Sequence, residues 1–447
     1  MSTISPFACC ANAAREQKRY PFCLSEANKS VGVFAHEDIC TTEGLLLVPN
    51  GHPITDSLAK TIATHELKKP LVDSVYVANP IDLNTLKTHF RELFSSFPDV
   101  KIVNERHDFQ ETLEELIDFC PLEPILLGEL TVFRECFPSI FRKTIFCTWI
   151  SSLVAFVLEY DKETLQDVFL SGLSHDIGFL HIPKQLFMQS SPLTPQEWLA
   201  IQSHVVLGND LLGKIYGSES VVANAALEHH ERLDGSGYPL GKKNEHINKV
   251  SQIIGIADMI QAVRGRFEPH GRTLKDLSSF LKINSGRISD EIRYAVTSIL
   301  DRSEILRVDA GERNNLKQTI DSLVHYESCL KRSIEHIADI ENSVALSISV
   351  GGEKISKLIA PVNEMVCISG LASGKNLDWL FSLQKTPSIV SPEEICETEM
   401  TQNELSWQID SVCKAVRHEV FVSKNIDSHM EHAFYLSSKI SWLLNNK

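Results

Sequence analysis

The feature that most constrains this chain is residues 174–258, a segment in which clusters of His, Asp and Gly recur within a helical pattern. Histidine and carboxylate side chains bind transition metals, and a metal site needs several of them to converge from separate elements. In order, the clusters read SHDIG (174–178), LTPQEW (193–198), SHVVLG (203–208), EHHERLDGSGYP (228–239) and IADM (256–259). The segment therefore predicts helices whose ends bring these side chains to one metal site.

The predicted helices are marked by apolar periodicity and by signals at their ends. Apolar residues spaced three and one apart lead into His175–Asp176; they are Leu165, Val168, Phe169, Gly172 and Leu173. The sequence TPQE at 194–197 begins a helix directed toward His204, with a Thr cap, Pro at the first position and Glu three residues after the cap. The turn DGSGYP (234–239) ends a helix directly after His229–His230, so both neighbouring rings can reach one centre.

We expect the ligands to come from all of these clusters. Asp176 is the predicted catalytic residue, because one carboxylate can bridge two cations through its two oxygens. A lone His-Asp or His-His pair is more often structural than metal-binding, but the occurrence of all the clusters in this order favours a metal site. The predicted ligands are His175, Asp176, His204, His229, His230 and Asp258.

Composition limits the partners and the number of domains. A chain of 447 residues predicts about two or three domains. The net charge of -15 argues against a broadly basic surface, so no nucleic acid polymer is expected as a partner. A small anionic ligand could still bind where local cations or metals reverse the field.

The cysteines and the most apolar segment indicate a cytoplasmic protein. The eleven cysteines form no CxxC pair, and their odd number in a long chain without an evident signal peptide favours reduced thiols. Residues 144–158 are uncharged but fall short of the roughly 20 residues of a spanning helix. We therefore expect a buried core helix there and no membrane span.

The clusters resemble the HD-GYP branch of the HD phosphohydrolase superfamily. The motifs that carry the resemblance are HDIG, LTPQEW, SH-x3-G, HHERLDGSGYP and IADM, within roughly residues 126–285. The resemblance implies an all-helical core that holds two or three iron or manganese ions, with zinc as an alternative. It also implies hydrolysis of cyclic di-GMP to pGpG or GMP by water that the metals activate.

The same resemblance implies a substrate groove lined by the Gly-Tyr-Pro loop. Tyr238 either stacks on or borders a guanine, or only packs the loop. Arg266, beyond Asp258, is a weaker candidate for contact with phosphate, as is Arg272. The predicted substrate-binding residues are Arg232, Asp234, Gly237, Tyr238, Pro239 and Arg266.

The expected fold class is mainly α. Residues 1–125 form a small N-terminal α+β domain, after a weakly ordered lead-in to about residue 30, with strands near 44–48 and 73–79. This domain is a candidate sensory or regulatory unit. Residues 126–285 form the HD-GYP domain, and residues 286–447 form a helical domain that senses, dimerises or packs on the core.

Two departures from the family pattern bear on activity. The family reads HDIGK with the Lys near the scissile phosphate, but this chain has Phe179, and Lys184 cannot be assumed to replace it. The family also has a metal-binding His about 32 residues before the HD pair, whereas no histidine lies between His107 and His175. His181 follows closely, but we expect it to be a supporting or surface residue.

These departures leave two functions open. The first is a phosphodiesterase of reduced activity with one intact and one weakened metal position. The second is a module that binds cyclic dinucleotide or a partner protein in signalling without turnover. Homodimers or a signalling partner could form through the flanking domains, and action on another nucleotide phosphate also stays open.

Overall fold

The computed structural model of the protein describes residues 19–188, 193–267, 272–303, 316–347, 349–369, 371, 374–385, 392–423 and 426–445. The chain divides into two compact units. The first comprises Met1–Gly265 with Tyr294–Ser303, and the second comprises Arg266–Arg293 with Glu304–Lys447. The whole of segment 174–258 lies in the first unit. The three domains expected from the sequence stay a prediction.

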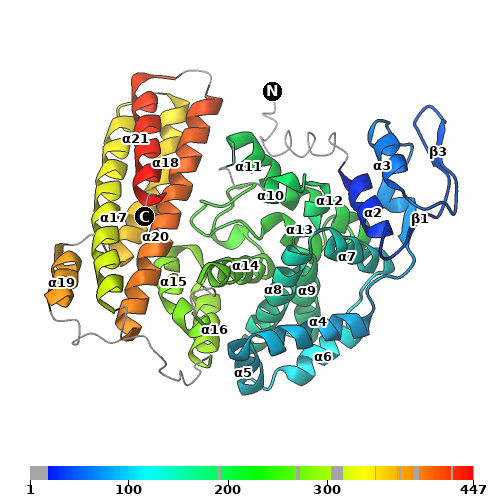
Figure 1. The fold of residues 1–447 in the computed structure, drawn as a ribbon, viewed down its shortest axis with the longest axis horizontal. Coiled ribbons are helices and arrows are strands. Elements are labelled where there is room, and N and C mark those ends of the chain that lie inside the picture. The colour runs from blue at the N-terminus through cyan, green and yellow to red at the C-terminus, as the bar shows by residue number, and fades with distance from the viewer. Residues whose placement is uncertain are drawn as a thin grey trace. The chain divides into compact units, whose positions relative to one another are not determined.

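The first unit begins with a small α+β region (Figure 1). Strand β1 (Val33–Ala35) pairs antiparallel with β4 (Val75–Val77), and β2 (Ile39–Cys40) pairs with β3 (Leu46–Val48). The two strands expected from the sequence are thus confirmed as β3 and β4. The helices of this region are α2 (Tyr20–Asn28), α3 (Asp56–Ala63), α4 (Leu83–Ser96), α5 (Pro98–Arg106) and α6 (Gln110–Phe119).

Side chains of this region fix the helix starts. Thr55 accepts a hydrogen bond from the backbone N–H of Leu58, and Asp82 accepts one from Thr85. Both are the N-caps expected for such residues. The expected lead-in to about residue 30 is wrong for α2, which buries Cys23 and Leu24 and packs against α3 and α7 (Pro124–Cys136). The residues before 19 lie outside the described part of the chain.

The rest of the first unit is helical, which confirms the expected all-helical core. Helix α8 packs against α9, α9 against α13, and α12 against both α13 and the 3-10 turn η2. The elements are α7, α8 (Pro138–Val157), α9 (Lys162–Ser174), η2 (Ile177–His181), α10 (Gln185–Met188), α11 (Pro195–Gln202), α12 (His204–Tyr216), α13 (Val221–Glu228), η3 (Asn244–His246) and α14 (Lys249–Phe267).

Helix α8 is the apolar helix at the centre of this core. It is long and apolar enough to span a membrane, with a mean hydropathy of 1.5, yet 72% of that window is buried inside the protein. Phe141 and Trp149 are among its fully buried side chains. Its burial agrees with the core helix expected at residues 144–158.

The second unit is a helical bundle with its own apolar core. Helix α17 packs against α21, and α20 packs against both α18 and α21. Core side chains such as Leu330, Ile359, Ile409 and Ile440 are completely buried. The elements are η5 (Leu274–Leu277), α15 (Ser278–Ile283), η6 (Ser285–Arg287), α17 (Leu316–Val344), α18 (Val350–Ser369), α19 (Gly374–Lys385), α20 (Pro392–Val422) and α21 (Ser428–Asn445), while α16 (Asp290–Asp301) is divided between the two units.

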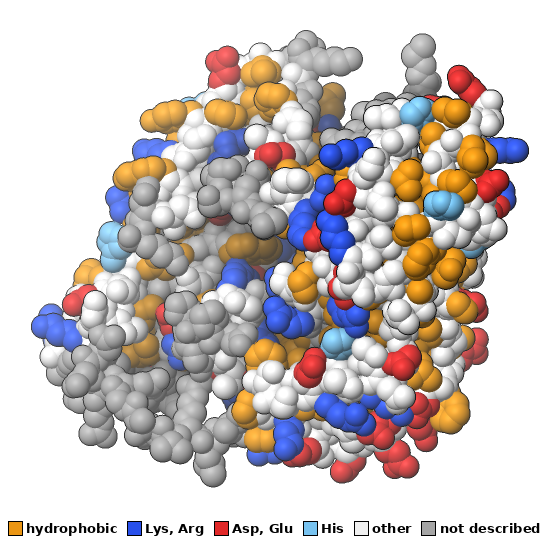
Figure 2. Space-filling model, turned by 45° about the vertical axis from the view of Figure 1, so that its right-hand side comes forward, with side chains coloured by type: hydrophobic (Ala, Val, Ile, Leu, Met, Phe, Trp, Pro, Cys, Tyr) orange, Lys and Arg blue, Asp and Glu red, His pale blue; other side chains and the backbone are white. Residues whose placement is uncertain are grey.

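The surface carries charges of both signs. On the face drawn in Figure 2, Lys and Arg side chains are interspersed with Asp and Glu. This distribution fits a chain with 43 basic and 58 acidic residues. An anionic ligand would therefore depend on a local concentration of positive charge rather than on a general attraction.

Candidate metal centre

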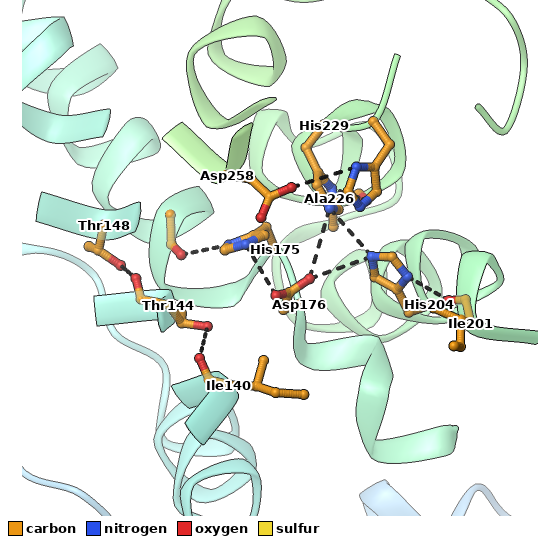
Figure 3. Close-up of polar contacts among 12 residues, drawn as sticks. Ile140, Thr144, Thr148, His175, Asp176, Ile201, His204, Ala226, His229 and Asp258 are labelled. Atoms are coloured by element: carbon orange, nitrogen blue, oxygen red, sulfur yellow. Dashed lines mark hydrogen bonds and ion pairs between the residues drawn. The ribbon is translucent and has the colours of Figure 1, made fainter. Parts of the chain in front are cut away.

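Three histidines of the segment anchor one ring nitrogen on the helical turn that precedes them and present the other to a common point (Figure 3). Each Nδ1 donates to the backbone carbonyl three residues earlier, at 2.8 Å for His175, 2.7 Å for His204 and 2.9 Å for His229. A carbonyl can only accept, so each Nδ1 carries a proton, and in the neutral ring Nε2 keeps its lone pair. This is the tautomer in which a backbone carbonyl orients a metal-binding histidine.

The Asp176 carboxylate lies between the three Nε2 atoms. Its Oδ1 is 3.5 Å from His204 Nε2 and 3.9 Å from His229 Nε2, and its Oδ2 is 3.4 Å from His175 Nε2. The two Nε2 atoms of His204 and His229 are 3.4 Å apart. Asp176 therefore has one oxygen toward each side of the site, as expected for a bridging carboxylate.

Helix ends place these side chains, as predicted, with one correction. His175 follows the last residue of α9, and His229 follows the last residue of α13. His204 was expected near the end of its helix, but it is the first residue of α12. The helical path is interrupted at Ser203, between α11 and α12. His204 therefore starts a new helix, with its ring toward Asp176.

Glycine 178 allows α12 to come close enough for this arrangement. A Cβ added at Gly178 would lie 2.0 Å from the backbone oxygen of His204 and 2.7 Å from the backbone nitrogen of Gly208. No real side chain fits there, so the glycine of the HDIG motif is needed for contact between η2 and α12. The HDIG motif thus supplies two of the predicted ligands, His175 and Asp176, and its glycine leaves room for the third, His204.

His230 and Asp258 complete the set on the other side. His230 Nδ1 is 3.7 Å from Asp258 Oδ2. The ligand atoms of His204, His229 and His230 lie within 4.8 Å of one another, as do those of His175, Asp176 and His229. The structure therefore brings all six predicted ligands together. That they bind metal stays a prediction.

Burial keeps most of the imidazoles neutral. Burial lowers the pKa of His204, and burial and then the neighbouring imidazoles lower the pKa of His229 and His230 well below the usual value. Burial also acts to lower the pKa of His175, but the adjacent Asp176 carboxylate outweighs it and raises this pKa to about 9. In the absence of another cation, His175 therefore carries the positive charge that balances Asp176.

The pKa values of the two carboxylates, Asp176 and Asp258, shift in opposite directions. Burial acts to raise the pKa of Asp176, but the surrounding imidazoles, His175 first, hold it well below its usual range. Burial and then the Asp176 charge raise the pKa of Asp258 to about 6. A bound divalent cation would favour the charged form of both groups.

The side chains present fit a divalent metal. Ligand atoms about 2.1 Å from one ion, at tetrahedral or octahedral angles, lie about 3.0–3.4 Å apart, close to the separation of 3.4 Å between His204 and His229. Two facing lone pairs in a buried site repel unless a cation lies between them. Histidine with carboxylate suits iron, manganese or zinc and does not choose among them.

The segment that carries these side chains lies within a match to a known domain family. Residues 135–290 match the HD domain family. The chain is 36% identical over 138 residues to a 3′3′-cGAMP-specific phosphodiesterase 1 of Vibrio cholerae, covering 30% of this chain and 32% of the relative. It is 30% identical over 161 residues to a cyclic di-GMP phosphodiesterase of Thermotoga maritima, covering 35% and 42%. It is 32% identical over 146 residues to the cyclic di-GMP phosphodiesterase response regulator RpfG of Xanthomonas campestris, covering 32% and 38%.

The chain contains an HD domain of the HD-GYP family. The match spans between about a third and two fifths of the length of these relatives, so it concerns this domain alone. A solved HDG"Y"P protein, Bd1817 from Bdellovibrio bacteriovorus, aligns with 61% of this chain and 94% of its own at 15% identity and a TM-score of 0.33, a superposition too loose to transfer detail.

The loop of the HD-GYP domain is held to the metal centre from within. Glu231 accepts the backbone N–H groups of Leu240 at 2.6 Å and Lys242 at 2.9 Å, which closes the loop. A Cβ added at Gly237 would lie 2.4 Å from the Glu231 Cα, so this glycine allows the loop to fold back on the helix end. The sequence prediction missed the role of Glu231, although it is the Glu of the HHER motif.

The predicted substrate residues of this loop already have internal contacts. The Arg232 guanidinium donates to the His229 carbonyl at 2.9 Å and caps the end of α13. Asp234 accepts the backbone N–H of Ser236 at 2.8 Å and forms the turn. Tyr238 comes directly before Pro239 in the chain. Its ring stacks on the His230 ring with centroids 4.6 Å apart. These contacts favour the loop-packing alternative for Tyr238, and substrate binding by the five predicted loop residues, Gly237 included, stays a prediction.

Arg266 and Arg272 lie in the second unit. Arg266 donates to Glu404 at 3.1 Å and lies over the Trp407 ring, and Arg272 donates to Glu399 at 2.5 Å. Their predicted contact with phosphate stays untested. Within their own unit, both arginines form ion pairs with carboxylates of α20.

Phe179, in the place of the family lysine, packs on a predicted ligand. Its ring stacks on the His204 ring with centroids 4.2 Å apart and an interplanar angle of 18°, and it meets Phe187 edge-on at 5.0 Å. Lys184 donates to Glu26 at 2.8 Å, so it already has an anionic partner. His181 stacks on Tyr20 and belongs to none of the potential ligand groups in the described ranges.

A further potential ligand group contains Cys147, which the sequence prediction did not include. The thiol, His175 and Asp258 offer ligand atoms that all lie within 4.8 Å of one another. Cys147 is on α8, the helix expected to carry the missing histidine. Thr144 and Thr148, on either side of it, donate to backbone carbonyls of their own helix (Figure 3).

Proposed function

We propose that this protein is a metal-dependent phosphodiesterase that hydrolyses cyclic di-GMP to pGpG or GMP. The observation that carries the proposal is the set of three buried Nε2 atoms around Asp176, each fixed by an Nδ1–H bond to the backbone. The names of the relatives support a cyclic dinucleotide as the substrate. Iron or manganese is the proposed cofactor, with two ions as the proposed number.

The residues of the centre have separate roles in this proposal. His204, His229 and His230 would hold one ion, His175 and Asp258 would hold the other, and Asp176 would contribute to both. When bound, the ions supply Lewis acidity and lower the pKa of water to about 7. Asp176 positions the site for in-line attack on phosphorus. The loop around Tyr238 borders the place where the dinucleotide would bind.

The test is product formation by metal-loaded protein. Purified protein reconstituted with manganese or iron should convert cyclic di-GMP to pGpG, measured by chromatography. Asp176→Asn and His204→Ala should abolish this activity while circular dichroism shows an unchanged helix content. A parallel reaction with 3′3′-cGAMP tests the alternative dinucleotide named in a relative. No turnover of either substrate by protein shown to hold metal would remove the enzyme proposal.

Binding without turnover is the second candidate function. Phe179 cannot donate to a phosphate, and the family's upstream histidine is missing. Removing one preorganised group of this kind costs about 10²–10³ in rate. Calorimetric binding of cyclic di-GMP with no product over the same period would favour the binding module. A homodimer or signalling partner, and a cytoplasmic location, stay predictions.

A further inference from the structure

We propose that Cys147 is a metal ligand, and that its thiolate joins His175 and Asp258 in the second metal position of the centre. This inference rests on the metal centre of the proposed function. It assigns to this chain a ligand that lies outside the recognised motifs, on α8, about one helical turn after the point near residue 143 where the family has a histidine.

The first observation is the geometry of the group. The Cys147 sulfur, a His175 ring nitrogen and an Asp258 oxygen lie within 4.8 Å of one another. Cys147 and His175 are both only 1% exposed, while Asp258 retains 24% exposure of its side chain. One sulfur, one nitrogen and one oxygen then face a shared point that solvent reaches from the Asp258 side.

The second observation is independent and concerns His175. Its Nε2 is buried and has no hydrogen-bond partner in the described part of the chain, although Asp176 Oδ2 lies 3.4 Å away. Its Nδ1 is already committed to the Gly172 carbonyl at 2.8 Å. A buried nitrogen without a hydrogen-bond partner destabilises the folded state unless another group or an ion binds it. An ion shared with Cys147 and Asp258 would satisfy it.

The third observation separates Cys147 from the other buried cysteines of the first unit. The thiols of Cys23, Cys120 and Cys136 each bond to a backbone carbonyl, of Leu180, Gln166 and Cys23 respectively. Cys147 makes no such bond among the described residues. Its thiol lies instead near the side chains of two predicted metal ligands, His175 and Asp258.

The packing of α8 on α9 fixes this placement. A Cβ added at Gly172 would lie 2.8 Å from the Thr148 Cα and 2.9 Å from Ser151 Oγ, so the two helices touch through this glycine. The contact is three residues before His175, at the end of α9. Cys147, next to Thr148, is thereby held beside His175 by backbone contact rather than by flexible side chains.

A thiolate ligand changes the expected metal chemistry. When the ion binds, an S–metal bond replaces the S–H bond and the proton is released to solvent. Thiolate favours iron, zinc or cobalt over manganese, which prefers oxygen ligands. The second position should therefore select a softer metal than a site of histidine and carboxylate alone.

Cobalt(II) provides the test, because a thiolate bound to it gives a near-ultraviolet charge-transfer band. We expect this band in the wild-type protein, its loss in Cys147→Ala, and its persistence in Cys120→Ser as the matched control. Elemental analysis should show fewer ions per chain in Cys147→Ala, with affinity at the second position at least tenfold weaker, since even outer-shell changes cost about 10–100-fold. Cys147→His should restore the metal count without the band.

Two outcomes would overturn the inference. Metal bound equally by wild type and Cys147→Ala, with no thiolate band in either, refutes the ligand and leaves the proposed phosphodiesterase intact. Absence of metal from the wild-type protein after reconstitution refutes both. Far-ultraviolet circular dichroism of every variant separates a lost ligand from a lost fold.

Discussion

At the scale of single residues, the centre depends on how its histidine rings are held as well as on which residues are present. His204 is fixed from two sides, by the Ile201 carbonyl at 2.7 Å and by the face of Phe179 at a centroid distance of 4.2 Å. Phe179 is only 8% exposed. Phe179, which departs from the family pattern, therefore helps to position His204, a predicted ligand. Replacing Phe179 should weaken metal binding in addition to any effect on phosphate binding.

Phe179→Leu should weaken metal binding by roughly tenfold, the scale of a lost outer-shell partner. The change keeps an apolar side chain but removes the stacked contact, which is worth about 0.5–1.5 kcal/mol. Titration with metal, followed by calorimetry, measures the effect. The control is Phe187→Leu, which loses the edge contacts with Phe137 and Phe179, whereas Phe179 is the ring that stacks on His204. Equal metal affinity in wild type and Phe179→Leu would contradict the positioning role.

At the scale of elements, close backbone approach decides where the ligands meet. The contact of η2 with α12 depends on Gly178, because an added Cβ would lie 2.0 Å from the backbone oxygen of His204. The clash involves backbone and cannot be relieved by rotating a side chain. The two elements, and the ligands they carry, would have to separate.

Gly178→Ala should therefore lose metal binding and destabilise the first unit by about 1–3 kcal/mol or more, the range for an overpacked core. Denaturant unfolding and metal titration measure the two effects. Gly128→Ala on α7 is the matched control, since its Cβ would meet only Val77 Cγ2 at 3.6 Å. The control should be neutral or slightly stabilising. If Gly178→Ala behaves like Gly128→Ala, close packing does not position His204.

A second contact between elements, α2 with α7, should make stability depend on pH. Burial raises the pKa of Glu129 to about 7, although the hydrogen bond from Tyr20 acts to lower it. The folded state then binds the proton more tightly than the unfolded chain, whose pKa is near 4.5. This contribution is fully present below about pH 4.5 and is lost as the pH rises through about 7, by about 3 kcal/mol.

Glu129→Gln tests this dependence, because the amide keeps an acceptor for Tyr20 but does not ionise. The variant should be more stable than wild type at pH 7.5 and nearly equal to it at pH 4, in urea unfolding followed by circular dichroism. Tyr20→Phe removes the bond that lowers the pKa and should extend the pH-dependent loss of stability to higher pH. Identical pH slopes for wild type and Glu129→Gln would show that this carboxyl does not titrate with folding.

At the scale of the whole molecule, the features that could be predicted from the sequence are those that depend on short local motifs. The Thr194 helix cap, the helical core and the convergence of His175, His204 and His229 on Asp176 all follow from motifs a few residues long. The ligand set was predictable because the spacing of these motifs carried a family resemblance.

Orientation around a buried helix was not predictable in the same way. Helix α8 is buried at Phe141 and from Thr144 to Ala155, so this stretch has no exposed polar face to show which side meets the metal centre. Cys147 could be assigned only once the packing of α8 on α9 was known. The Tyr20–Glu129 contact likewise joins residues more than a hundred positions apart. Tertiary packing, absent from local patterns, decides both.

The division into two units gives the last prediction, on metal removal. All six predicted ligands and Cys147 lie in the first unit, and no ligand group in the described ranges involves the second. Metal bound only to the folded state stabilises it by about 2.7 kcal/mol at a hundred times Kd. A chelator should therefore lower the unfolding temperature of the first unit and leave that of the second unchanged.

Differential scanning calorimetry with and without chelator measures this effect as the movement of one transition out of two. In His229→Ala the same chelator should move neither transition, because a ligand of the centre is already gone. The buried imidazoles also predict that chelation destabilises the first unit. The Nε2 atoms of His204 and His229 are 3.4 Å apart, and without a cation between them their lone pairs repel. A shift of both transitions, or of the second alone, would show that the metal stabilises the chain somewhere other than the HD-GYP centre.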